Sequence, residues 1–447
     1  MRSLSIIAAL TMKTAVVGGV ISIPTPQSTP QVGIIELLAS ARGVAPTLCA
    51  LASDGATSGW GGWDAPDPAI RANVRQLVRD MRGPALDAAD SKVLVDALSS
   101  DDACVRHLAG TLIGRSGDTT FVPMLASTLR ASNSDERAGA ARALGLLGKK
   151  SAVDEIAHAL HDATPAVRAN AAWALGRIGE RRVAPDVAAL VRDDVADVRG
   201  AAAVSLGQLR AADNIDVLLR VLHDDADPEV RRSAAWALGT IGSRNGADGL
   251  AAALHSDKSV PVREMSAWAL AQVHARDQVD ALTTALHGDA DATVRETAAW
   301  ALGEIEVKRA ADVLADAASS DKDAKVRSTS AWAVGQLNPG RVPKPLVTAL
   351  HDSDDEVRLA AAWAISQIGD DSAVPDVTAA LRTEKQDRVR QALVRALLES
   401  GDRSSDVFKD LLESKDQDTR EMAVRALAGR RGPWPWPWPQ PRPRPFP

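Results

Sequence analysis

The chain has 447 residues, a length that points to more than one ordinary globular core. Aromatic residues make up only 3% of it and tyrosine is absent, so its cores must be thin layers of small and aliphatic side chains in a helix-favouring composition. The formal net charge of −6 gives no general attraction to phosphate backbones, which disfavours nucleic-acid binding but leaves room for a local basic stripe.

Residues 1–30 have the features of a targeting segment followed by a spacer. A basic start precedes two apolar runs that Lys13 interrupts, and initiation at Met12 gives the tidier signal MKTAVVGGVIS. The pattern predicts a signal peptide on a bacterial-type protein that is exported, periplasmic or secreted. A membrane anchor is the alternative, although the run is short and broken for a spanning helix; a cytoplasmic location is a further one.

Residues 31–95 are predicted to form a helical N-terminal cap, with a Gly/Trp-rich loop followed by the helix-like AIRANVRQLVRDM. The two cysteines, Cys49 and Cys104, match no zinc-site spacing. In an exported protein they could form one disulfide that ties the cap to the first repeat. The alternative is that both are small buried hydrophobic residues.

An internal repeat dominates residues 96–430. The segment VRANAAWALGRIG, Val167 to Gly179, recurs as VRRSAAWALGTIG from Val230 and as VRETAAWALGEIE from Val294. The arginines of the successive copies stand 30 to 32 residues apart: Arg106, Arg137, Arg168, Arg199, Arg231, Arg263, Arg295, Arg327, Arg358, Arg390 and Arg420.

Each period contains two amphipathic stretches, of which the VR…ALG segment is the second. Its apolar residues fall on one stripe of a helix at about 100° per residue, as in Val230, Ala234, Ala237, Leu238 and Ile241. Gly239 and Gly242 lie at its C-terminal end, where a positive φ can stop a helix. No run alternates with a period of two, so strands are not expected. The sequence therefore predicts an all-α fold, a right-handed α-solenoid of about eleven two-helix repeats.

The repeat carries a family resemblance. The Asp-x4-Val-Arg pattern, as in Asp225–Arg231 and Asp352–Arg358, resembles the HEAT repeat, and the following AAWALG resembles the bilin-lyase-type subclass of short HEAT-like repeats. The resemblance covers residues 96–430. It implies the fold but not the function, because such repeats occur in scaffolds, adaptors and a few enzymes.

Three repeated columns are best interpreted as structural. The turn aspartate is expected to cap the second helix and the arginine to bridge to the next repeat's turn, forming a ladder that weakens late in the array at Glu384 and Ser414. A functional charged groove is the alternative. One histidine per repeat ends the first helix and suits the helix dipole rather than a metal, whose ligands must converge. These histidines are His161, His223, His255, His287 and His351.

The most informative column lies five residues after each repeat arginine, about 140° from the centre of the apolar stripe, so it should point away from the core. The resemblance implies that the second helices line a concave face, which predicts a ladder of indoles about 10 Å apart. Glutamines one turn further on, and Glu304 in the same place, add hydrogen-bonding groups. The candidate partner-binding residues are Trp173, Trp236, Trp268, Trp300, Trp332, Trp363, Gln272, Gln336, Gln367, Arg142, Arg395 and Arg425.

Two interpretations of the tryptophan column remain open. Each indole could lie flat against small residues of the adjacent helix and fill space there. Alternatively, regularly spaced aromatic rings in a groove suit an extended ligand such as a polyproline peptide or a sugar chain. Both can hold together.

Residues 431–447 form a Pro/Trp/Arg-rich tail that cannot join a helix, because alternating prolines fix extended polyproline geometry. It resembles Trp/Pro-rich and Arg/Pro-rich membrane-active peptides. The alternatives are a tail with no contact, attachment to a membrane or envelope surface, and docking into a tryptophan-lined groove of its own or a neighbouring solenoid. The candidate contact residues are Trp434, Trp436, Trp438, Arg442 and Arg444.

Catalysis has little support in the sequence. The deoxyhypusine hydroxylases, which resemble this architecture, need His-Glu dipeptides that the chain lacks, and no GxSxG, P-loop or HExxH motif is present. We therefore expect a non-catalytic scaffold or adaptor, without cofactor or metal, that binds a partner protein or extended polymer along its concave face. The alternative is an accessory enzyme of the bilin-lyase type that acts on a chromophore or prosthetic group.

Overall fold

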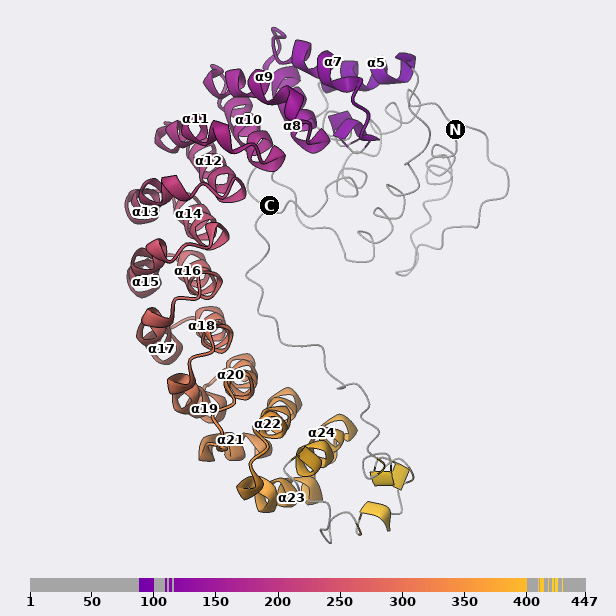
Figure 1. Cartoon of the computed structure of the whole chain (residues 1–447), viewed down its shortest axis with the longest axis vertical. Helices are drawn as coiled ribbons and strands as arrows, with labels where there is room; N and C mark the ends of the chain where they lie inside the picture. Colours follow the sequence, from indigo (N-terminus) through magenta and orange to yellow (C-terminus); the bar gives the residue numbers. More distant parts are fainter. Residues whose placement is uncertain are drawn as a thin grey trace, which may run out of the picture. The chain divides into compact units, whose positions relative to one another are not determined.

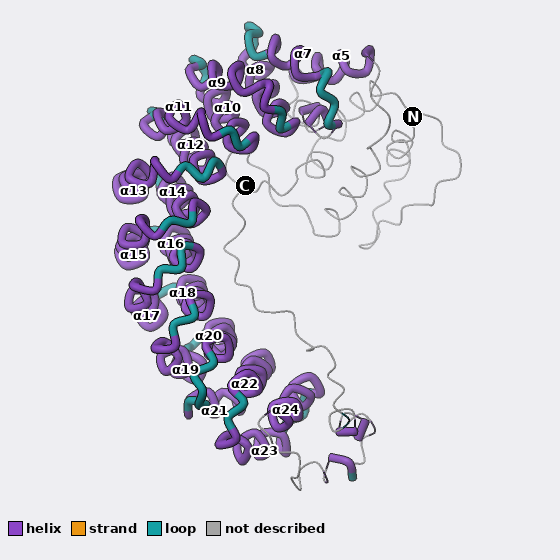
Figure 2. Tube along the Cα trace, in the orientation of Figure 1, coloured by secondary structure: helices purple, strands orange, loops and turns teal. Residues whose placement is uncertain are grey.

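A computed structural model describes residues 88–99, 109–110, 112–114 and 116–399, together with isolated residues between 409 and 428. Helices and loops alone make up this part of the chain (Figure 2), which confirms the all-α prediction. The targeting segment, most of the cap, both cysteines, Arg425 and the tail lie outside the described residues. Among the described helices, none combines the length and the apolar character that crossing a membrane requires.

The chain divides into two compact units, and the division falls within helices α13 and α14. Unit 1 contains α5 (Ala88–Asp96), α7 (Phe121–Thr128), α8 (Ser134–Leu147), α9 (Val153–His158), α10 (Pro165–Ile178), α11 (Ala184–Ala189), α12 (Ala196–Gln208), most of α13 (Ile215–Asp224) and most of α14 (Pro228–Ile241). Unit 2 contains α15 (Ala247–Ser256), α16 (Val260–Gln272), α17 (Val279–Gly288), α18 (Ala292–Ile305), α19 (Ala311–Ser320), α20 (Ala324–Leu337), α21 (Lys344–Thr348), α22 (Asp355–Ile368), α23 (Val374–Thr383) and α24 (Asp387–Glu399).

Consecutive helices form pairs, and the pairs stack side by side in each unit. From α7 to α24 the described residues contain nine complete pairs, each with an odd-numbered first helix and an even-numbered second helix. Within unit 2 the pairs follow an arc, and the second helices α16, α18, α20, α22 and α24 form its inner row (Figure 1). The predicted α-solenoid is therefore confirmed, with the second helices placed as the resemblance implied.

The second helices bury the stripe that the sequence predicted. In α18, for example, Val294, Ala298, Ala301, Leu302 and Ile305 are all at most 1% exposed. Small residues on this stripe let neighbouring helices approach closely, so the core is a continuous thin layer within each unit. Each pair buries its apolar face only by stacking on the next, as expected for a solenoid.

Where the structure describes it, the residue eleven positions after the repeat arginine follows the second helix in a left-handed conformation. At Gly242 the φ is +75°, which confirms its predicted role as a helix stop. The same conformation is adopted in other repeats by Arg210, His274 and Glu306, with φ of +50°, +48° and +58°. Gly239 does not stop the helix as predicted, because it lies inside α14 and serves close packing instead.

Candidate functional site

The repeat arginines form the predicted ladder. Seven of them each donate two hydrogen bonds to the acidic residue of the next repeat, with an Nε–carboxylate distance of 2.7 Å in every pair. The pairs are Arg137–Asp162, Arg168–Asp193, Arg199–Asp225, Arg263–Asp289, Arg295–Asp321, Arg327–Asp352 and Arg358–Glu384. The longer Glu384 keeps the pairing, so the ladder does not weaken there as predicted.

The ladder aspartate orders its own turn but does not cap the second helix, contrary to the prediction. Asp289 Oδ1 accepts a bond from the backbone N–H of Asp291 at 2.9 Å, and it is Asp291 that caps α18 by accepting from Thr293 N–H at 2.8 Å. The carboxylate of Asp289 is two residues too early to reach the free N–H groups of the helix. Its second partner is Arg263, so it joins two repeats.

These bonds shift the ionisation of the ladder. Burial raises the pKa of Asp289, but the hydrogen bonds from Arg263 and from the Asp291 backbone outweigh it and hold the pKa below its usual value. At Asp162 the bond from Arg137 is the largest cause, and it also lowers the pKa. The ladder carboxylates are therefore charged and fully engaged, which makes them structural rather than catalytic.

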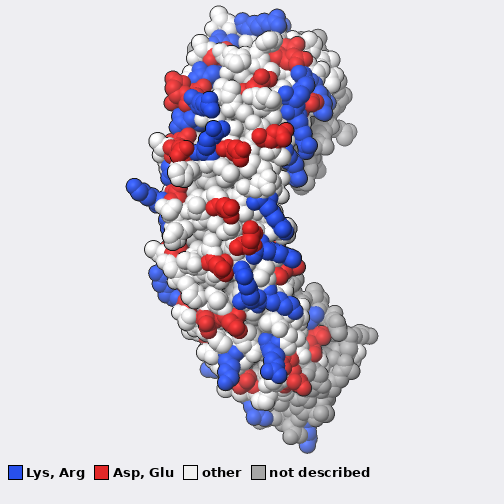
Figure 3. Space-filling view, turned by 60° about the vertical axis from the view of Figure 1, so that its left-hand side comes forward, with Lys and Arg blue, Asp and Glu red and all other residues white. Residues whose placement is uncertain are grey.

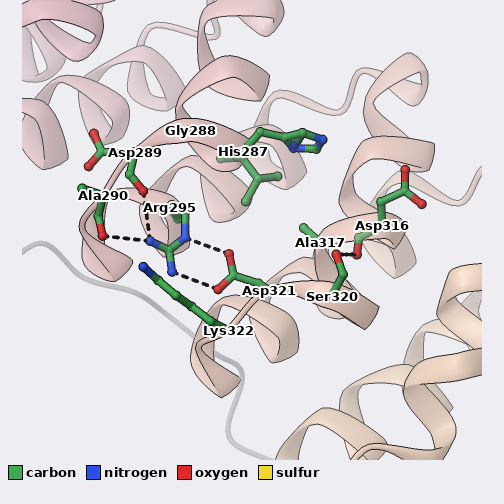
Figure 4. A pocket seen from close by; sticks show the side chains of 11 residues that line it. His287, Gly288, Asp289, Ala290, Arg295, Asp316, Ala317, Ser320, Asp321 and Lys322 are labelled. Atoms are coloured by element: carbon green, nitrogen blue, oxygen red, sulfur yellow. Dashed lines mark hydrogen bonds and ion pairs between the residues drawn. The ribbon is translucent and has the colours of Figure 1, made fainter.

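A groove of about 440 Å³ beside the ladder in unit 2 is lined by His287, Asp316 and Lys322 among others (Figure 4). Arg295 crosses it, donating to the Asp289 carbonyl at 3.0 Å and to Asp321. Arg295 is paired with Asp321, and Asp289 is paired with Arg263, so the ladder groups that line the groove are already engaged. Across the described residues, no three His, Cys, Asp or Glu side chains come together to hold a metal ion.

The tryptophans of the second helices lie against the preceding repeat. In five repeats a glycine eight residues after the repeat arginine leaves a slot that the next indole occupies. A methyl group added at Gly335 would stand 2.5 Å from Trp363 Cζ3, and one at Gly239 would stand 2.8 Å from Trp268 Cζ3. The same slot holds Trp173 at Gly145, Trp236 at Gly207 and Trp332 at Gly303. These contacts are those of the packing interpretation.

The tryptophan side chains of the second helices differ in how much of their surface is exposed to solvent. Trp332 and Trp363 are only 3% and 2% exposed, so they do not point away from the core as predicted. Their indole rings pack against the glycine of the preceding second helix, Gly303 for Trp332 and Gly335 for Trp363, and this contact buries them. Trp173, Trp236, Trp268 and Trp300 remain partly exposed. A binding role for the exposed edges stays a prediction.

Carboxylates flank the two exposed rings of unit 2. We define the inner stripe of unit 2 as Glu264, Trp268 and Gln272 on α16 with Glu296, Trp300 and Glu304 on α18. Each set of three is spaced by four residues, which places it on one face of its helix. No Lys or Arg occupies these three columns in α16, α18, α20 or α22. Glu264 and Glu296 were missed by the sequence analysis, although their spacing to the tryptophans could have revealed them.

Two carboxylates of the inner stripe of unit 2, those of Glu296 and Glu304, have raised pKa values. Burial is the largest cause that raises the pKa of Glu296, and the charges of Asp323 and Glu264 add to it, while Lys325 opposes it. Burial and then the charge of Glu306 raise the pKa of Glu304. Both carboxylates would gain from a nearby cation, because an opposite charge favours their ionised form.

The same columns in unit 1 carry positive charge. The guanidinium carbons of Arg142 and Arg177 lie 5.2 and 5.6 Å from the ring centre of Trp173, within cation–π distance. Burial and the charge of Arg177 lower the pKa of Arg142, whose Nε has no hydrogen-bond partner in the described part. Arg232 lies in the same stripe, and no carboxylate does from α8 to α14.

The remaining candidates are less distinctive. Gln272, Gln336 and Gln367 are exposed at the ends of their helices, as predicted for groups beside the rings. Arg395 is partly exposed on α24. On the side brought forward in Figure 3, acidic and basic side chains are interspersed.

The family model for HEAT repeats matches the chain in overlapping windows, residues 91–164, 122–207, 187–260, 247–335 and 316–398. Together they span well over half of the sequence. The chain belongs to the HEAT-repeat family. No curated protein sequence matches this HEAT-repeat chain.

Solved structures similar to the HEAT-repeat chain confirm the fold. Kap95p, in a study of its binding to RanGDP, has a TM-score of 0.54 at 15% identity, covering 88% of this chain and 62% of its own. Importin beta has a TM-score of 0.53 at 13% identity, covering 88% and 66%. The CpcE–CpcF phycocyanin lyase of Nostoc sp. PCC7120 has 22% identity over 56% of this chain and 94% of its own, but a TM-score of only 0.32.

Proposed function

We propose that this HEAT-repeat protein is a non-catalytic scaffold that binds a partner protein through an extended segment laid along its second helices. The observation that carries the proposal is the inner stripe of unit 2, where partly exposed indoles and glutamates recur at the spacing of the repeat. Aromatic rings and charged groups that recur along a groove suit an extended chain, which can present side chains at regular intervals. Kap95p, which binds RanGDP, has a similar fold.

The two units favour partners of opposite charge. The arginines around Trp173 suit acidic groups, whereas Glu296 and Glu304 suit basic ones. Such complementarity gives specificity and speeds association more than it adds raw affinity. We also propose that the partner is met outside the cytoplasm, because residues 1–30 have the features of an export signal.

Affinity capture from the native host, with the full chain as bait, tests the proposal. The informative variant is E296Q/E304Q, which removes two charges from the inner stripe of unit 2 with almost no change of size. Its matched control is D312N/D376N, because Asp312 and Asp376 are exposed on the first helices α19 and α23.

If the protein is such a scaffold, quantitative mass spectrometry should find a protein that the wild-type and D312N/D376N baits capture and the E296Q/E304Q bait does not. The helical circular dichroism and thermal midpoint of both variants must match the wild type. Equal capture by all three baits would show that the stripe is not the binding surface.

A further inference from the structure

The C-terminal segment of the chain has the chemistry that the inner stripe of unit 2 lacks. From Met422 to Pro447 the sequence contains no Asp or Glu, while Arg430, Arg431, Arg442 and Arg444 supply positive charge. The stripe supplies glutamates and no Lys or Arg in the same columns from α16 to α22. The two surfaces are therefore complementary in charge.

They are also complementary in shape. The alternating prolines of residues 433–447 favour polyproline II geometry, which advances about 9 Å in each turn of three residues. Packed helices lie about 8–10 Å apart, so successive repeats of the stripe have nearly the same spacing. One face of the segment then presents Pro439, Arg442 and Pro445, one to each repeat.

We propose that the segment 433–447 of the same molecule binds along the inner stripe of unit 2. Pro445 stacks on Trp268, and Arg442 and Arg444 lie over Trp300 and face Glu296 and Glu304. This inference rests on the proposed function, because it uses the same surface, and it makes the segment a built-in competitor of any partner.

The segment is long enough for this contact. Four repeat steps separate α18 from the last predicted repeat, a distance of about 40 Å at helix-packing spacing. At the rise of polyproline II, the sixteen residue steps from Ala428 to Arg444 can span about 50 Å. Arg442 and Arg444 therefore reach the glutamates of α18 when the segment runs back along the inner row.

The raised pKa values of Glu296 and Glu304 support the assignment, since both carboxylates gain from a cation. Trp268 and Trp300 keep exposed surface for stacking, whereas Trp332 and Trp363 do not. A proline-rich segment loses little conformational freedom when its rings stack on aromatic faces, because each proline already restricts the backbone.

Hydroxyl-radical footprinting of the full chain, read by mass spectrometry, tests the proposal. The variant R442E/R444E reverses the charge of the segment without touching the repeats. Oxidation of Trp268 and Trp300 should rise at least about twofold in this variant at low salt, because reversed charge releases the segment. Trp332 and Trp363 are internal references and should stay protected in both proteins.

Two additions control the result. A synthetic peptide of residues 433–447 should restore protection of the variant's two rings. Introducing E296R/E304R into the R442E/R444E chain should restore it without peptide, because the charges are exchanged. Unchanged oxidation of Trp268 and Trp300 upon charge reversal would overturn the proposal.

Other occupants give other outcomes, each of which overturns the assignment to the same molecule. Protection that appears only with dimer formation in gel filtration would mean a second copy. Co-sedimentation with phosphatidylglycerol vesicles that R442E/R444E abolishes, with no change in the footprint, would mean a membrane surface. If charge reversal leaves the oxidation of Trp268 and Trp300 unchanged but the capture experiment succeeds, only the docking of the segment is contradicted. If the footprint changes as expected but no partner is captured, only the partner-binding function is contradicted.

Discussion

The glycine slot at Gly335 allows a quantitative test of how the tryptophan column is held. An alanine Cβ there would lie 2.5 Å from Trp363 Cζ3 and 2.8 Å from the Cα of Ala364. Alanine stabilises an unhindered helix interior by up to about 1 kcal/mol relative to glycine. Overpacking of this kind costs about 1–3 kcal/mol, since a backbone atom cannot step aside as a flexible side chain can. The net expectation for Gly335→Ala is a loss of about 1 kcal/mol in the free energy of unfolding.

The column contains its own graded controls. At Gly303 the added Cβ would be 3.0 Å from Trp332 Cζ3 and 3.1 Å from the Cβ of Ala333, so Gly303→Ala should be close to neutral. Nature has already placed Ala271 in the equivalent position before Trp300. Gly288 ends α17 with nothing within 4 Å, so Gly288→Ala should be neutral or slightly stabilising.

The assay is urea denaturation followed by both circular dichroism and tryptophan fluorescence. Two probes are needed because repeat arrays depart from two-state unfolding, and the affected interface between α20 and α22 can open locally. A Gly335→Ala variant that is as stable as the wild type or more so, like Gly288→Ala, would contradict the predicted clash with Trp363.

Three further predictions concern the ladder and the alternative function. Arg295→Ala should lower the free energy of unfolding by about 3–5 kcal/mol, because it leaves Asp321 without its charge partner in a pair whose side chains are only 4% and 9% exposed. The control Arg309→Ala removes an exposed pair and should lower the free energy of unfolding by under about 1 kcal/mol. Equal losses for the two variants in urea denaturation would contradict this. The ladder carboxylates have lowered pKa values in the folded state, so their contribution to the free energy of unfolding is complete above the unfolded pKa of about 4 and is lost as the pH falls through the folded values. The thermal midpoint should therefore decrease below about pH 4. A midpoint that stays constant down to about pH 2 would contradict this. Tetrapyrroles added to the purified protein should give no visible spectral shift, whereas a saturable shift would favour the bilin-lyase-type activity.

The sequence was sufficient to predict the solenoid and its ladder, because both follow from the period. An arginine at a fixed place in every repeat must face the next repeat's turn, so the pairing of Arg263 with Asp289 was foreseeable. Which aspartate caps the helix could not be predicted, because Asp289 and Asp291 both lie in the turn and only the backbone path decides which one reaches the helix N-terminus.

The candidate site was only partly predictable. Helical geometry gives the direction of a Cβ atom, but whether an indole then stands up or lies down depends on the neighbouring helix. Gly239 was interpreted as part of a helix end, although it forms the slot that Trp268 occupies. Glu296, four residues before Trp300, could have been predicted from the sequence, because the helical period places both residues on one face.

The central claim, that partners bind along the second helices of unit 2, is tested most directly by site-specific photocrosslinking. A photoreactive residue placed in the full chain at Gln272, which is exposed in the inner stripe, should crosslink to the captured partner. The same residue at Asp312, exposed on the first helix α19, should not. Crosslinking from Asp312 and not from Gln272 would contradict the account.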